Sequence, residues 1–125
     1  MRAYTVAAVA LTLNTSAKWV DNTLSHYPIP GVVQTRQGIS RRLTPQAVII
    51  LEIALQISRN LSVPVRRALE IARILEQADG MAQVSVGPFG KLMLDVTSVR
   101  HAIGERLAQA VELTPNPRRG RPPGS

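Results

Sequence analysis

The chain has 125 residues, enough for one compact domain with an appendage, and this length excludes large multi-domain enzymes. It contains no cysteine, so disulfide scaffolds, thiolate zinc sites and thiol nucleophiles are excluded as well. Fifteen lysines and arginines against eight acidic residues give a net charge of +7, which favours an anionic partner, with nucleic acid first.

The first predicted helix covers the apolar residues 6–13, and Thr5 is its predicted N-cap. Asn14 follows as a turn residue that tolerates the left-handed backbone conformation. Ser16 can cap a second helix over residues 17–24. Two short helices joined by a short turn predict a helix-turn-helix. The alternative is an ordinary helical hairpin with a solvated outer face.

The same N-terminal stretch has some features of a secretory signal, because Arg2 precedes it and small residues follow it at 15–17. The apolar run is short and is broken by Thr12, so we expect a cytoplasmic, nucleoid-associated protein instead. No segment approaches the roughly eighteen apolar residues of a membrane span, and we expect no membrane partner.

The second predicted helix carries polar side chains on its outer face. An α-helix fits the major groove of DNA, where base edges present a distinct pattern of donors and acceptors. Asn22 suits an adenine edge, and Lys18 suits a guanine or a phosphate. Asp21 is a poor neighbour for a phosphate but could accept a hydrogen bond from cytosine. This face is therefore a candidate for base recognition.

A basic hairpin is predicted next, with extended runs at 32–34 and 39–43 around a polar turn. Arg36, Arg41 and Arg42 give it three positive charges and no acid, as expected for a wing that lies along a phosphate backbone. The alternative is a solvated basic hairpin without a nucleic-acid contact.

Two further helices are predicted after this hairpin. Thr44 and Pro45 predict the start of a mostly buried helix, because proline is favoured at the first helical position. Ser62 and Pro64 are predicted to open the next helix, which Asp79-Gly80 ends.

The C-terminal part alternates at 81–86 and 91–96 around residues 87–90, which predicts a β-hairpin. A narrow apolar stripe at 99–111 predicts a final helix. A hairpin with one helix buries too little apolar surface to form an independent core, so we expect it to pack on the preceding helix or on a second copy of the chain. Phe89 at the predicted tip is the candidate contact for a protein partner.

The tail from Thr114 onward has proline or glycine at six of twelve positions, three arginines and no acid, so we expect it to be disordered when free. Within it, Arg119-Gly120-Arg121-Pro122 matches the core of an AT-hook. In such a hook two arginines enter the narrow minor groove of A·T-rich DNA. A nonspecific phosphate-binding tail and an inert tail are the alternatives.

Tyr4-Thr5-Val6 opens the chain, the helix pair follows, and residues 38–45 run Gly-Ile-Ser-Arg-Arg-Leu-Thr-Pro. This order of elements over residues 4–75 resembles the DNA-binding domain of the MerR family and its excisionase-like relatives. The resemblance implies a winged helix-turn-helix. The positions that it assigns to DNA are Ser16, Lys18, Asp21 and Asn22 on the recognition helix and Arg41 or Arg42 on the wing.

The chain departs from the family pattern at several positions. Asn14 stands where a glycine is usual, Leu43 where an aromatic residue is common, and Asp21 where arginine is frequent, so the base preference cannot be transferred. The family's long dimer helix and cysteine-based effector sites are missing, and metal sensing is therefore not implied.

The expected fold class is mainly α with small β-hairpins. The expected organisation is a winged helix-turn-helix in residues 1–62, a helix, hairpin and helix for dimerisation or partner docking in 63–113, and a basic tail in 114–125.

The function that these features predict is a sequence-specific transcription regulator that binds double-stranded DNA as a dimer. One alternative is an antitoxin whose C-terminal half binds a toxin protein, and another is an excisionase-like or nucleoid architectural protein. An enzyme is not expected, because possible nucleophiles such as Ser16, Ser40 and Ser85 have no histidine near them in the sequence. No metal or cofactor is expected either, since His26 and His101 are far apart.

Overall fold

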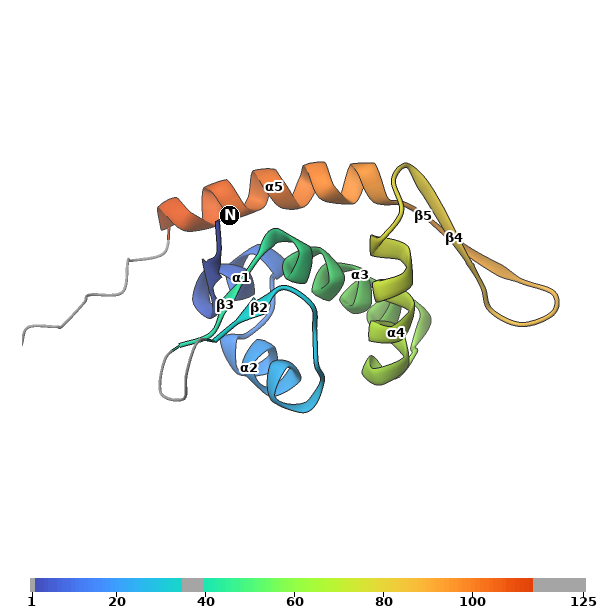
Figure 1. Cartoon of the computed structure of the whole chain (residues 1–125), viewed down its shortest axis with the longest axis horizontal. Helices are drawn as coiled ribbons and strands as arrows, with labels where there is room; N and C mark the ends of the chain where they lie inside the picture. The colour runs from blue at the N-terminus through green and yellow to red at the C-terminus, as the bar shows by residue number, and fades with distance from the viewer. Residues whose placement is uncertain (1, 35–39, 114–125) are drawn as a thin grey trace, which may run out of the picture.

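The computed structural model describes residues 2–34 and 40–113. Within these ranges the chain forms five α-helices and two small antiparallel sheets, which confirms the mainly helical α+β class (Figure 1). The elements in chain order are β1 (Tyr4–Thr5), α1 (Val6–Leu13), α2 (Ala17–His26), β2 (Val32–Val33), β3 (Arg42–Leu43), α3 (Pro45–Leu61), α4 (Val65–Glu76), β4 (Met81–Ser85), β5 (Lys91–Asp95) and α5 (Val96–Leu113).

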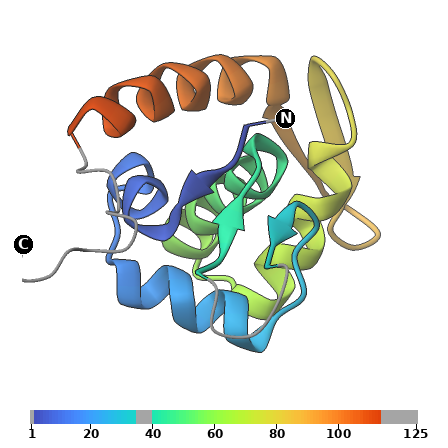
Figure 2. The same cartoon turned by 60° about the vertical axis from the view of Figure 1, so that its left-hand side comes forward.

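Helix α3 lies at the centre of the fold, and ten of its seventeen residues are buried. Helix α4 packs along it, and α5 crosses α1 and α3 on the side of the molecule opposite α2 (Figures 1 and 2). One hydrophobic cluster joins Val9 of α1, Leu51 of α3 and Leu107 of α5. Residues on both sides of the expected boundary at position 62 therefore contribute to the same core.

Local side-chain chemistry places the first two helices, as predicted. Thr5 Oγ1 accepts a hydrogen bond from the Ala8 amide at 3.1 Å and caps α1. Asn14 takes the left-handed conformation with φ 55° and ends this helix. Ser16 Oγ accepts from the Trp19 amide at 3.0 Å and caps α2, which continues beyond the predicted end to His26.

Two helix starts differ from the sequence prediction. Ser62 does not open α4; it takes the left-handed conformation with φ 56° and ends α3. Pro64 is the N-cap residue, and its ψ of 144° lies outside the helical region, so α4 begins only at Val65. Val96 is the first residue of α5 rather than the end of the second hairpin, since Asp95 caps the helix at this point.

The first sheet has the order β1-β3-β2 and includes a strand that the sequence did not predict. Tyr4–Thr5 pairs with one edge of β3, and Val32–Val33 pairs with the other. In the described part of the two predicted extended runs, Val32–Val33 and Arg42–Leu43 form the strands. Leu43 in the central strand is fully buried, so burial of this one side chain anchors the small sheet to the core.

Gly31 brings the chain close to the start of α3. Its carbonyl accepts from the Thr44 amide at 2.9 Å, and a Cβ atom at this position would lie 2.3 Å from Thr44 Oγ1. The φ of 93° also favours glycine. Thr44 stands at the N-cap position as predicted, but its side chain makes no capping hydrogen bond, and its buried hydroxyl has no hydrogen-bond partner among residues 2–34 and 40–113.

Arg100 of α5 binds the end of α4 to the rest of the fold. Its guanidinium lies 3.4 Å from Glu76 Oε2 and donates to the carbonyl oxygens of Glu76 and Ala78. Gln46 at the start of α3 donates to Glu76 Oε1 at 3.3 Å. The Glu76 carboxylate is buried, so these donors replace the water that it lost on folding.

We expect Arg100→Ala to lower the free energy of unfolding by about 2 to 4 kcal/mol, because it leaves the Glu76 carboxylate buried with one weak donor. Urea unfolding followed by Trp19 fluorescence measures this loss. Arg67→Ala is the control, since it removes the exposed Arg67–Glu70 ion pair at a cost below about 1 kcal/mol. Equal losses for the two variants would contradict the structural role of Arg100.

The Asp95 carboxylate caps α5 by accepting from the Ser98 hydroxyl at 2.8 Å and from the Ser98 amide at 3.1 Å. These hydrogen bonds, the one from the hydroxyl first, hold the pKa of Asp95 below its ordinary value. The cap therefore stabilises the fold above the ordinary pKa of aspartate and stops doing so as the pH falls through the lowered pKa.

We accordingly expect Asp95→Ala to unfold at lower urea concentration than the unaltered chain at neutral pH, and the difference to disappear in strong acid. Unfolding curves at a series of pH values test this. A difference that stays constant down to the acid limit would mean that the charge of Asp95 has no part in the cap.

Candidate nucleic-acid interface

Helix α2 exposes one polar face. Val20 and Thr23 are buried against the core, and Thr23 Oγ1 donates to the Trp19 carbonyl at 2.8 Å. The exposed positions recur at helical spacing and form one continuous face, which is called the α2 face below. Its members are Ala17, Lys18, Asp21, Asn22 and Ser25.

Lys18 and Asn22 lie one turn apart on the α2 face, and both are exposed. Neither side chain has a hydrogen bond or ion pair to the part of the chain that the structure describes. Their donors and acceptors are therefore available to a ligand. The helix also continues to His26, whose Nδ1 lies 2.7 Å from the Asn22 carbonyl oxygen, so the helix is two residues longer than the predicted range 17–24.

Ser16 is exposed at the start of α2, and its hydroxyl oxygen is used for the cap. A serine hydroxyl that accepts one hydrogen bond can still donate its own proton. The position of Ser16 thus combines a local structural role with the capacity to donate to an acceptor such as a phosphate oxygen.

Arg41 and Asp21, both predicted as DNA contacts, contact each other. Arg41 Nη1 lies 3.7 Å from Asp21 Oδ1 and donates to the Asp21 main-chain carbonyl at 3.2 Å. The pair ties the strand region before β3 to α2. It also places a positive charge beside the one acidic group of the α2 face, so this acid repels an approaching anion less.

Arg42 is on the outer side of the first sheet. It pairs with Thr5 on one side and Val33 on the other, while the next residue, Leu43, turns into the core. In the described ranges the Arg42 side chain has no hydrogen bond or ion pair. A hollow of about 270 Å³ lies beside it, and its lining residues are Thr5, Val6, Ala7, Asp21, Ser40, Arg41 and Arg42.

Of the remaining predicted site residues, the structure describes Phe89. Arg36, Arg119 and Arg121 fall outside residues 2–34 and 40–113, so the structure does not describe them. Phe89 is 98% exposed in the turn between β4 and β5. This hairpin projects on the side of the molecule away from β2 and β3 (Figure 1). The candidate interface thus consists of the α2 face with Arg41 and Arg42.

Sequence reasoning did not identify the contact between Arg41 and Asp21. It also did not show that the first turn of α1 lines the hollow. The two residues of the pair are twenty positions apart, and only the formation of β1 and β3 brings them together. A strand of two residues gives almost no periodic signal, so no pattern in the sequence could have located it.

No protein-family model, curated protein or solved structure matches the chain. The resemblance to the MerR family therefore stays a prediction from the sequence. Over the described ranges, no helix is both long enough and apolar enough to cross a membrane. Within the same ranges, no three histidine, aspartate or glutamate side chains come close enough together to hold a metal ion.

We expect Arg41→Ala to loosen the sheet while leaving the helices intact, because it removes the attachment of β3 to α2. Hydrogen exchange measured by mass spectrometry should show faster exchange in peptides that contain Arg42 and Leu43. Arg42→Ala is the matched control, since it removes a neighbouring guanidinium without this contact. Unchanged exchange in the Arg41 variant would show that the pair does not hold the sheet.

Proposed function

We propose that this protein is a sequence-specific, DNA-binding transcription regulator of the winged helix-turn-helix type that acts as a dimer. The observation that carries the proposal is the α2 face: unpartnered Lys18 and Asn22 side chains stand on one exposed helical face, next to the positive charges of Arg41 and Arg42. In this proposal α2 enters the major groove and the first sheet serves as the wing.

The side chains of the α2 face suit base recognition by simple hydrogen-bond chemistry. The Asn22 amide can donate and accept together with the N6 and N7 edge of adenine, and Lys18 can donate to guanine or to a phosphate. Asp21, already bound to Arg41, acts in this proposal as a support for the wing rather than as a base contact. The small Ala17 and Ser25 side chains permit close approach of the helix to base edges.

Arg42 is the proposed phosphate contact. It is half-buried and lines the hollow beside the first turn of α1, and the amide groups at the start of a helix favour an anion. A phosphate oxygen in this hollow would meet the Arg42 guanidinium and the positive end of α1 together. Phosphate contacts fix the position of the protein on the duplex, while the α2 face supplies the selection of sequence.

Selectivity is the argument for a dimer, because one such module contacts few base pairs and two half-sites multiply the discrimination. The basic residues 114–125 would add contacts in an A·T-rich minor groove or along phosphates. The +7 net charge supports this partner, since counterion release on binding DNA favours cationic surfaces. Such a regulator would act at the nucleoid in the cytoplasm.

A binding titration tests the proposal directly. A preferred site is selected from random duplexes, and its affinity for the full chain is compared with that of scrambled DNA at several salt concentrations. We expect a preference of about a thousandfold or more for the selected site. Weak binding without preference would refute a dedicated regulator and favour an architectural protein or a partner-dependent one.

Asn22→Ala should reduce the preference for the selected site by about 1 to 3 kcal/mol and leave binding to scrambled DNA nearly unchanged, because it removes a base contact. Competition titrations with the two DNAs measure the difference. Gln109→Ala removes an exposed amide side chain on α5, outside the α2 face, and is the matched control that should alter neither affinity. Equal losses on both DNAs for the Asn22 variant would contradict its role in reading bases.

Arg42→Ala should weaken binding to all DNA and lower the salt dependence of the affinity by about one unit of the logarithmic slope, as expected for one lost phosphate contact. Arg73→Ala on α4 removes an exposed arginine remote from the α2 face and serves as control. An unchanged slope in the Arg42 variant would remove the wing from the proposed interface.

The antitoxin function is the second candidate, and the exposure of Phe89 favours it. A fully exposed aromatic side chain at a hairpin tip is typical of a contact with another protein. This function does not exclude DNA binding, since an antitoxin can also repress. Stable co-purification of the chain with one stoichiometric protein partner would distinguish it from the leading proposal.

A further inference from the structure

The second hairpin, formed by β4 and β5, projects from the body of the molecule (Figure 1). The register places Ala82 opposite Leu94 and Val84 opposite Leu92, so these four side chains share one face. Ala82, at the base, is buried against the core. Toward the tip the cover is lost, and Phe89 is almost completely exposed.

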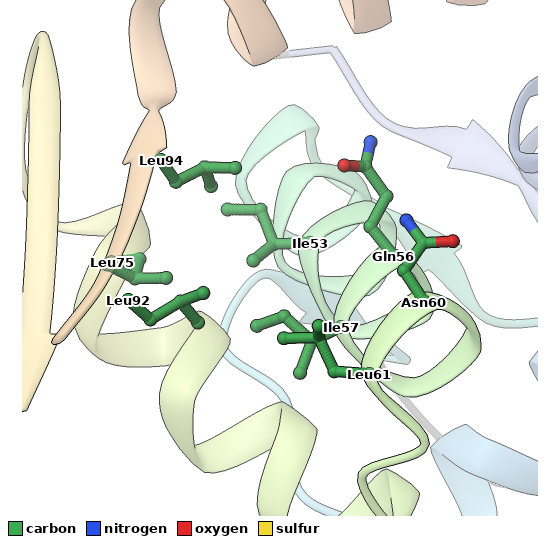
Figure 3. A pocket seen from close by; sticks show the side chains of 8 residues that line it. All are labelled: Ile53, Gln56, Ile57, Asn60, Leu61, Leu75, Leu92 and Leu94. Carbon is green, nitrogen blue, oxygen red and sulfur yellow. The ribbon is translucent and has the colours of Figure 1, made fainter. Parts of the chain in front are cut away.

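The apolar face of this hairpin forms one wall of a groove. Figure 3 shows Leu92 and Leu94 of β5 facing Ile53, Ile57 and Leu61 of α3. Leu75 of α4 also lines the groove, and Gln56 and Asn60 provide its polar edge. The groove encloses about 170 Å³, and Leu61 at its end is 56% exposed.

The hairpin tip is held in shape by its own backbone. The Val86 amide donates to the Gly90 carbonyl at 3.0 Å, and Gly87 adopts a φ of 122° that favours glycine. Pro88 restricts the turn further through its ring. Phe89 therefore projects from an ordered turn. Binding of a partner to Phe89 costs little conformational entropy in this segment.

The groove and the hairpin are poor in charge on a strongly basic chain. Lys91 is the only charged residue from Met81 to Leu94, and none of the eight residues that line the groove is charged. Two copies with a net charge of +7 repel one another, so they can associate only where few charges meet. An acidic or nucleic-acid partner would find almost no cation on this surface.

We propose that a second copy of this chain covers the groove, with Phe89 of each copy lying in the groove of the other across a two-fold axis. A two-fold interface needs a projection and a recess on the same surface, and this surface has both. Phe89 alone contributes about 200 Å² of apolar area. That is about a quarter of the 800 Å² per partner that a standard interface buries. The exposed side chains of Val86 on the hairpin and Leu61 at the end of the groove would add further apolar area.

This inference rests on the proposed function, because selective DNA binding is the reason that a dimer is needed. The test of the inference uses no DNA. Sedimentation equilibrium of the full chain should show a dimer at micromolar concentration. Phe89→Asp should raise the dimer dissociation constant about thirtyfold or more, because it places a charge in an apolar recess. Met93→Asp is the matched control: Met93 is exposed on the opposite face of the same hairpin and should leave the dimer intact.

A second measurement exploits the absence of cysteine from the chain. Phe89→Cys and Leu61→Cys chains are mixed and oxidised, and a disulfide between the two different chains is expected because the tip of one copy lies near Leu61 of the other. A mixture of Met93→Cys and Leu61→Cys chains is the control and should stay uncrosslinked. Near-native circular dichroism spectra establish that each variant is folded.

A chain that is monomeric up to about 100 µM would overturn the proposal and assign the groove to a different protein, as in the antitoxin alternative. Equal dissociation by Phe89→Asp and Met93→Asp, or no crosslink between positions 89 and 61, would overturn it as well. Failure of the DNA proposal appears separately, as a dimer that binds selected and scrambled DNA equally.

Discussion

Burial of α3 is the constraint on which the rest of the structure depends. Only four of the 125 residues are aromatic, so the core has to be assembled from many small aliphatic side chains rather than a few large rings. A helix whose residues are buried on nearly every side needs cover from several directions. Helices α4 and α5, helix α1 and the strand that holds Leu43 supply this cover, and their arrangement leaves the α2 face exposed.

The contact between Arg41 and Asp21 gives each residue a different role in the proposed interface from the one that it would have alone. Taken singly, an acid on a helix that approaches DNA is a disadvantage, and an arginine before a strand is a phosphate contact. Taken as a pair, they fix the distance between the helix and the sheet, and the acid loses much of its repulsive effect. The unpartnered groups Lys18, Asn22 and Arg42 then have defined places relative to one another, as a preorganised interface requires.

Much of the fold follows from local chemistry that the sequence displays. Thr5, Asn14 and Ser16 determine where the first two helices begin and end, and their effects act within four residues. Features that depend on distant partners could not be predicted in the same way. The pairing of Tyr4–Thr5 with β3 and the left-handed Ser62 are of this kind, since a two-residue strand and a single backbone angle have no periodic pattern. The candidate residues of the α2 face were predicted, whereas their arrangement with Arg41 needed the tertiary structure.

The position of α5 has a consequence for the order in which the chain can fold. Val96 to Leu113 lie against α1, a helix formed by residues more than eighty positions earlier, so this contact closes a very long loop. During synthesis the N-terminal helices leave the ribosome long before α5 exists, and the apolar surface of α1 that α5 will cover stays open for that interval. Completion of the proposed DNA-binding part is thereby linked to completion of the chain, and a product that ends before α5 lacks the cover of its first helix.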